Sequence, residues 1–168
     1  EIYEFYYDVS DDEVVLTGFD GESKVLEIKP TYEVDGTEYK TNLLEFYLSG
    51  SDVETLILYD GISEVNTAMF NMSDVNKVFF PKTMETVYDY TLAYLHPDDG
   101  QMIQIYYEGT QDEWSEIFAE YKRTKVEDAE GAEEIGTAIA DKINDMIGTE
   151  YDSSKFEFFF SASPDDLK

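Results

Sequence analysis

Apolar side chains recur at a fixed spacing along the middle of the chain. Residues 51–72 and residues 73–95 carry them at matching positions, 22 residues apart. The matched pairs are Val53 and Val75, Leu56 and Val78, Leu58 and Phe80, Val65 and Val87, and Phe70 and Leu92. A repeat of this length is typical of a solenoid, because each unit buries its apolar edge only by stacking on the next. The pattern therefore predicts short parallel strands that stack side by side.

The same pattern predicts the core. On a strand, side chains alternate between the two faces, so one set of apolar positions must point inward. We expect the following ten residues to be buried: Leu56, Leu58, Val65, Phe70, Val78, Phe80, Val87, Leu92, Ile103 and Ile105.

The segments around the repeats predict further strands. Residues 2–21 alternate apolar and polar side chains on both sides of an acidic turn, which indicates a β-hairpin. Asp35 and Gly36 predict a tight turn, because both residue types tolerate a positive φ. Residues 102–107 and 155–160 alternate in the same way and are expected to be strands.

Two helices are predicted in the second half of the chain. Thr110 and Glu113 have the spacing of a capping box, at the start of a short helix. Residues 124–148 predict a longer helix, with Gly148 as its C-cap. Its apolar stripe consists of Ile135, Ile139, Ile143, Met146 and Ile147.

The repeated pattern is L-x-x-L-x-L, then a turn, then I-x-x-V and a bulky residue, and it resembles the BspA-like class of leucine-rich repeats. The run Y-x-G-T-x-x-E-W at residues 107–114 is similar to the segment that often closes such arrays. The resemblance covers about residues 6–118. It implies a leucine-rich-repeat solenoid in an extracellular bacterial protein that is displayed on the surface and adheres to host or bacterial proteins.

We therefore expect one α/β leucine-rich-repeat domain, rich in β-structure, over residues 1–163. The resemblance implies a hairpin cap at residues 1–21, and the repeats would occupy residues 22–118. A helical insertion and a closing strand follow at residues 119–163. Residues 164–168 are expected to be a tail.

The charge is strongly acidic, with 39 Asp and Glu against 11 Lys and Arg and a net charge of −28. Nucleic acids and anionic lipids are excluded as partners, because binding phosphate requires basic side chains. Such a charge keeps a protein soluble and monomeric. It also suits a calcium ion or a basic partner, and both alternatives stay open.

The sequence excludes several further classes of protein, because it lacks the residues or segments that they require. There is no cysteine, so neither a disulfide framework nor a thiolate metal site is possible. No apolar run reaches the roughly 20 residues of a membrane span. Because the chain begins at Glu1, we expect that a signal peptide or an anchor has been removed.

No catalytic motif is present. His96, the only histidine, precedes acidic residues in a polar loop, but no second histidine or cysteine accompanies it. The acidic turn at residues 8–13 lacks the ligand pattern of a calcium-binding loop. Nucleophile elbows, phosphate-binding loops and dinucleotide fingerprints are also missing. We expect neither an enzyme nor a cofactor or metal site.

One row of apolar side chains should point away from the core. If Leu56 and Leu58 face inward, Ile57 faces outward. The corresponding outward residues, and our candidate partner-binding residues, are Ile57, Phe79, Tyr106 and Phe159. An exposed apolar row must be covered by another segment or used to bind a partner. The helix at 124–148 either covers this row, which would leave binding to loops 31–37 and 96–100, or caps the end of the solenoid and leaves the row free.

The leading functional hypothesis is a non-catalytic extracellular module that binds or adheres to proteins. The alternatives are a structural spacer within a larger surface protein and a calcium-binding domain based on carboxylates.

Overall fold

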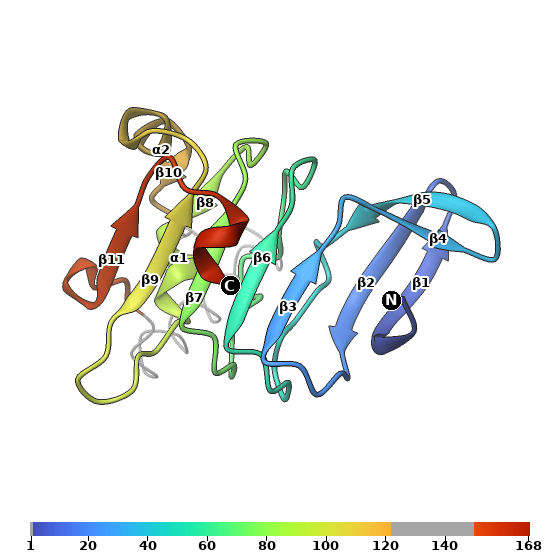
Figure 1. Ribbon diagram of the computed structural model, residues 1–168, viewed down its shortest axis with the longest axis horizontal. Helices are drawn as coiled ribbons and strands as arrows, with labels where there is room; N and C mark the ends of the chain where they lie inside the picture. Colours follow the sequence, from blue (N-terminus) through green and yellow to red (C-terminus); the bar gives the residue numbers. More distant parts are fainter. Residues whose placement is uncertain (1, 122–149) are drawn as a thin grey trace, which may run out of the picture.

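The computed structural model describes residues 2–121 and 150–168, which fold mainly into β-strands. These residues form three sheets, and Figure 1 shows the two larger ones next to each other. The five-stranded sheet consists, in spatial order, of β11 (Phe156–Phe159), β9 (Ile103–Tyr107), β7 (Lys77–Phe80), β6 (Thr55–Leu58) and β3 (Val25–Ile28). The four-stranded sheet consists of β1 (Phe5–Ser10), β2 (Glu13–Phe19), β5 (Thr37–Asn42) and β4 (Thr31–Val34).

The remaining described elements are short. They are the paired strands β8 (Val87–Tyr88) and β10 (Phe118–Ala119), the α-helices α1 (Asp89–Ala93) and α2 (Gln111–Ile117), and the 3-10 helices η1 (Ile2–Glu4), η3 (Ser153–Lys155) and η4 (Pro164–Leu167). None of the helices in the described part of the chain has the length and apolar character needed to cross a membrane.

The four-stranded sheet is mixed and curled. β1 and β2 form the predicted hairpin, and β4 and β5 form a second hairpin. The turn of this second hairpin contains Asp35 and Gly36 at φ values of 50° and 82°, as the sequence predicts. β2 and β5 then pair in parallel. The curl brings Phe5 of β1 close to Tyr32 of β4, with ring centroids 5.7 Å apart.

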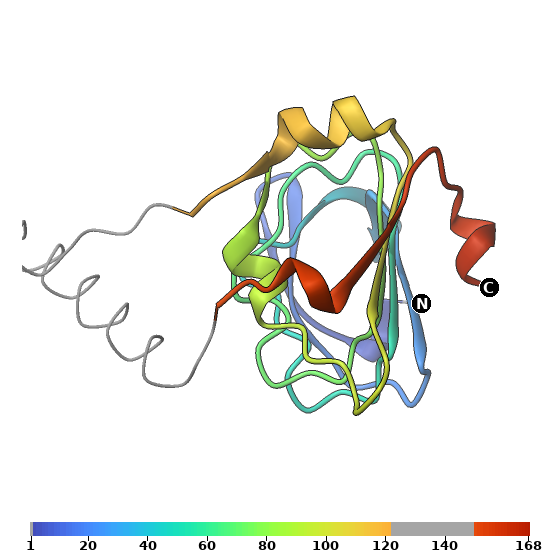
Figure 2. The same cartoon turned by 90° about the vertical axis from the view of Figure 1, so that its left-hand side faces the viewer.

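The five-stranded sheet is parallel throughout, and its inner face lines the main core. Leu56 of β6 pairs with Val78 of β7, which confirms the predicted register between these two strands. Seen end-on, this sheet forms one wall of the molecule and α1 lies on the opposite wall (Figure 2). Of the ten residues expected to be buried, nine are buried; the tenth, Val65, is only half-buried.

The predicted leucine-rich-repeat solenoid is wrong. The molecule is a small β-rich domain with mixed and parallel sheets, a curled half-barrel sheet and few helices. Residues paired across neighbouring strands are not evenly spaced along the chain. The separations are 30 residues between Leu26 and Leu56, 22 between Leu56 and Val78, 27 between Val78 and Ile105, and 53 between Ile105 and Phe158.

The physical reason for the error is that a short strand buried in a core has the same apolar pattern whether or not it belongs to a repeat. The 22-residue spacing specified one pairing, between β6 and β7. Residues 31–42, which the prediction placed in a first repeat, instead form a hairpin in the other sheet. The predicted helix at 124–148 lies outside the described residues.

The capping box at α2 is confirmed. Thr110 Oγ1 accepts a hydrogen bond from the Glu113 amide at 3.2 Å, and the Thr110 amide donates to Glu113 Oε1 at 3.1 Å. Gly109 directly before it is required by space, because a Cβ there would lie 2.5 Å from the ring of Tyr107. This segment fixes the end of β9. The C-terminal part of the chain forms hydrogen bonds to this end of the strand.

Leu58→Ala should be strongly destabilising. Leu58 is fully buried on the inner face, and its truncation leaves a cavity that the stacked neighbours cannot fill. The expected loss in free energy of unfolding is about 2–5 kcal/mol in urea denaturation. Met102→Ala, at a side chain that is 39% exposed, is the matched control and should have little effect. A loss below about 1 kcal/mol for Leu58→Ala would contradict the described packing.

Candidate functional site

The predicted row lies on the outer face of the five-stranded sheet. Strand register places Ile57 beside Phe79, Phe79 beside Tyr106, and Tyr106 beside Phe159. The rings of Tyr106 and Phe159 stack with centroids 4.6 Å apart and planes 15° apart. The sequence therefore predicted correctly that these four residues share one row.

The row is not free to bind a partner. Ile57 is fully buried and Phe79 is 1% exposed, because Ala162 and Leu167 pack on them. Tyr106 and Phe159 are half-buried. η4 lies across the outside of the sheet in both views (Figures 1 and 2). As candidate partner-binding residues, Ile57 and Phe79 are therefore corrected to residues covered by the chain itself.

The cover is the segment at residues 161–168, here called the C-terminal strap. Most of it had been expected to be a tail, whereas η4 is capped: the Ser163 amide donates to Asp166 Oδ2 at 2.8 Å, and Ser163 Oγ accepts from the Asp165 amide. The apolar stripe of the predicted helix lies outside the described residues. Neither of its two expected positions is tested, and a different segment covers Ile57 and Phe79.

The strap begins with two backbone hydrogen bonds to the end of β9 and its following loop. The Ser161 amide donates to the Gly109 carbonyl at 2.7 Å, and the Ala162 amide donates to the Tyr107 carbonyl at 2.9 Å. Ser161 has a φ of 50°, in the left-handed region that a serine rarely adopts. This residue turns the chain from β11 over the sheet.

The strap ends in a charged contact. Lys168 Nζ lies 2.9 Å from Glu27 Oε1 on β3 and donates to the Tyr59 hydroxyl at 3.2 Å. The Tyr59 hydroxyl also donates to Glu27. The Lys168 ammonium, followed by the Tyr59 hydroxyl, lowers the pKa of the Glu27 carboxyl below its usual range. Glu27 in turn is the main cause of the raised pKa of Lys168.

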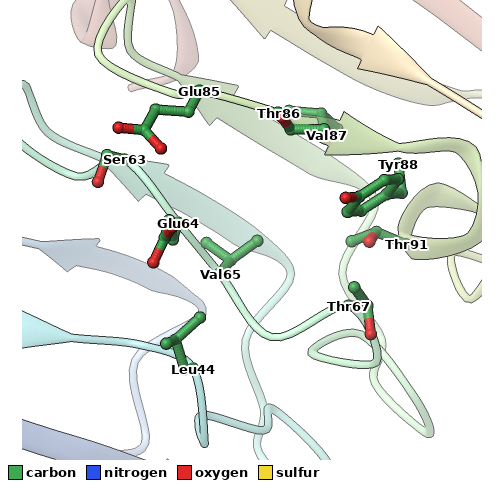
Figure 3. A pocket seen from close by; sticks show the side chains of 10 residues that line it. All are labelled: Leu44, Ser63, Glu64, Val65, Thr67, Glu85, Thr86, Val87, Tyr88 and Thr91. Atoms are coloured by element: carbon green, nitrogen blue, oxygen red, sulfur yellow. The ribbon is translucent and has the colours of Figure 1, made fainter. Parts of the chain in front are cut away.

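A groove on the wall that carries β8 and α1 is a second candidate surface, with a volume of about 310 Å³. Figure 3 shows the side chains that line it. They are Leu44, Ser63, Glu64, Val65, Thr67, Glu85, Thr86, Val87, Tyr88 and Thr91. Leu44 is 50% exposed and Val65 is half-buried, so both present apolar surface to solvent.

Successive loops build this groove by hydrogen bonding to one another. The Asn66 amide donates to the Leu43 carbonyl at 3.0 Å, and the Glu85 amide donates to the Ser63 carbonyl at 3.0 Å. Val65 and Val87 are one of the pairs at the 22-residue spacing. The repeat therefore has a structural result here: it aligns the loop at Val65 with the strand β8 at Val87, so that corresponding side chains line one groove.

Two carboxylates belong to the groove, Glu64 and Glu85 (Figure 3). Within the described residues neither of them forms an ion pair. The chain is already acidic, with a net charge of −28, so these groups add to a negative potential above an apolar floor. The groove is thus electrostatically suited to a cation.

A cluster of tyrosines adjoins the groove. Tyr88 lines it and meets the ring of Tyr121 edge to face at 5.4 Å. Tyr121 stacks on Tyr90 at 5.0 Å, and Tyr90 contacts Tyr94 at 5.1 Å. Asp89 Oδ1 accepts hydrogen bonds from the amides of Tyr90 and Tyr121 and so joins α1 to the segment after β10. These contacts hold Tyr88 in place beside the groove.

His96 lies in a separate polar groove with Glu54, Asp74, Asn76, Asp98 and Gln101. Among the residues that the structure describes, no group of three or more His, Asp or Glu side chains is arranged to hold a metal ion. The acidic turn at residues 8–13 is likewise not such a group. The structure thus brings no ligand cluster to His96.

The sequence reasoning missed the strap and the groove, although both have sequence signals. Ser163, Pro164 and Asp166 have the spacing of an N-cap, a first-turn proline and a capping carboxylate. For the groove, the signal is the 22-residue repeat that matches Val65 to Val87: Val87 is buried as expected, whereas Val65 is only half-buried and lines the groove.

The chain matches no protein-family model, no curated protein and no solved structure. The resemblance to BspA-like repeats therefore stays a prediction.

Acid should weaken the strap contact selectively. The lowered pKa of Glu27 means that its stabilising effect is present above the usual carboxyl value of 4.5 and is lost as the pH falls through the lower, folded-state value. The pair is partly exposed to solvent, so we expect only a small effect on the free energy of unfolding. Unfolding in urea should show a larger difference in stability between the parent chain and Glu27→Gln at pH 7 than at pH 3. An equal difference at both pH values would contradict this assignment.

Monovalent salt should raise the melting temperature, because it screens the repulsion within a chain of net charge −28. Calcium at the same ionic strength should give the same increase as sodium, since no metal-binding group is found among the described residues. Thermal unfolding followed by circular dichroism measures both. A much larger increase with calcium would establish an ion site.

Proposed function

We propose that this protein is a non-catalytic extracellular binding module of a bacterium, and that it binds a basic segment of a partner protein in the groove of Figure 3. One observation carries the proposal: an open apolar floor of Leu44, Val65 and Tyr88 lies next to the carboxylates of Glu64 and Glu85, which have no ion pair within the described residues.

The chemistry of the groove suits arginine or lysine. Both residues have an aliphatic stem that packs on apolar surface and a charged head that remains near polar groups. Here the stem would lie on Leu44 and Val65, and the head would reach Glu64 or Glu85. The ring of Tyr88 adds an electron-rich face for the cation.

The size of the groove supports this choice of ligand. A volume of about 310 Å³ is near the lower end of the range for small-molecule pockets, roughly 300–1,000 Å³. It fits one or two side chains of a protein segment. The net charge of −28 would also accelerate the approach of a basic partner.

The non-catalytic part of the proposal rests on the sequence, in which no catalytic motif is found. The extracellular location and the adhesion-type role rest on the resemblance at residues 107–114.

A structural spacer in a larger surface protein is the second candidate. One observation favours it: the strap buries Ile57 and Phe79, the central part of the predicted apolar row. A spacer benefits from having this apolar face covered, because open apolar patches promote association.

Reversing the charge of the groove should abolish binding of a basic probe. We expect an eight-residue peptide of alternating Arg and Leu to bind the parent chain, measured by fluorescence anisotropy at physiological salt. The double variant Glu64→Lys, Glu85→Lys should bind at least about tenfold more weakly, which is about 1.4 kcal/mol.

The control changes the net charge equally but elsewhere. Glu22 and Glu38 are exposed and lie outside the groove, so Glu22→Lys with Glu38→Lys should retain binding within about twofold. Equal losses in both double variants would show that the peptide responds to net charge alone. No binding to the parent chain would reject the groove and leave the spacer.

A further inference from the structure

The outer face of the five-stranded sheet carries its own hydrophobic cluster, separate from the main core. Ile57 and Phe79 of the sheet and Ala162 and Leu167 of the strap form it, and Tyr59 and Tyr106 pack at its margin. η4 contacts both β6 and β7. The strap is thus the element that keeps water from the centre of this face.

The face has two adjoining parts that suit two adjacent residues of a segment. One part is the apolar surface of Ile57 and Phe79, which receives Leu167. The other part is the Glu27 carboxylate with the Tyr59 hydroxyl, which receives Lys168. Glu27 pairs with Ile57 across β3 and β6, so the carboxylate lies directly beside the apolar surface.

Within the described part of the chain, few contacts hold the strap in place. Its backbone bonds to the rest of the chain come from Ser161 and Ala162, at its start. Beyond them, the described contacts to the sheet are the packing of Leu167 and the contacts of Lys168, whose side chain is 44% exposed. A segment held by few buried contacts opens locally at lower free energy than the whole fold.

We propose that the outer face of the five-stranded sheet is a second interaction surface, specific for a protein segment that presents a leucine followed by a lysine. The chain's own strap occupies this surface as a displaceable cover. A partner segment with the same pair of residues competes with the strap for Ile57, Phe79 and Glu27. This surface lies on the opposite wall from the groove, so it does not depend on the function proposed for the groove.

The test opens the strap in the full chain and supplies it again as a peptide. The probe is a fluorescent peptide with the sequence of residues 160–168, FSASPDDLK. The variant Leu167→Ser, Lys168→Glu removes both anchors in cis. We expect this variant to bind the peptide at least tenfold more tightly than the parent chain, whose own strap competes. A peptide with serine in place of its leucine is the control and should not bind.

A charge exchange tests the second part of the site. Adding Glu27→Lys to a variant opened by Leu167→Ser, Lys168→Ser, whose strap has no carboxylate at residue 168 to pair with the new lysine, should abolish binding of the FSASPDDLK peptide and favour one that ends in glutamate. The groove variant Glu64→Lys, Glu85→Lys should leave peptide binding to the opened chain unchanged. That control distinguishes a failure of the proposal for the outer face from a failure of the function proposed for the groove.

Circular dichroism shows whether each variant is folded. If the double variant does not fold, Lys168→Glu alone serves, because this change is at a partly exposed side chain and retains Leu167. A folded, opened chain that does not bind the peptide overturns the proposal. Equal affinity in the parent and opened chains does so as well, because the strap would then not occupy the binding surface.

Discussion

The whole arrangement depends on one constraint: β6, an internal strand of the five-stranded sheet, has apolar side chains on both faces. All four of its residues, Thr55–Leu58, are buried. A parallel sheet of this kind must be covered on both sides, because each face otherwise exposes a continuous apolar surface to water. Leu56 and Leu58 face the main core, whereas Ile57 belongs to the separate outer cluster. The protein therefore needs two covers of very different size.

The two covers are built differently, and this decides where binding surfaces can occur. The inner cover is a long series of loops and short helices that share one large core, so truncating a residue there affects the whole fold. The outer cover is a single short segment with one leucine and one lysine as its main anchors. Because few contacts within the described residues connect this cover to the sheet, we propose that it opens without global unfolding.

Local features of the fold could be predicted from the sequence. The β1–β2 hairpin and the Asp35–Gly36 turn follow from residue types that act over a few positions. The register between β6 and β7 follows from their matching apolar residues. The position of the strap could not be predicted in this way. The apolar character of Ile57 and Phe79 shows that a cover is needed, but it does not identify the segment, since any nearby amphipathic element satisfies the same requirement.

The predicted solenoid failed for a related reason. Extending one strand pairing to the whole chain assumes that every connection has the same length, yet residues 31–42 leave the sheet to form a hairpin and residues 96–102 lengthen the connection to β9. The groove was missed because a residue on a repeat position was assumed to be buried, whereas Val65 lies in a loop where only one side is packed. Periodicity predicts which residues are equivalent, but burial depends on what packs over each of them.

Charge connects the two candidate surfaces. Among 168 residues only 11 are lysine or arginine, and one of these, Lys168, closes the outer face by contacting Glu27. The groove has carboxylates of the same kind, but the described chain supplies no cation to them. In a chain with a large excess of carboxylates, a lysine beside a leucine is thus a scarce combination that the chain itself provides at the outer face. At the groove, the described residues provide no such combination, and we propose that a partner protein supplies the aliphatic stem and the positive charge.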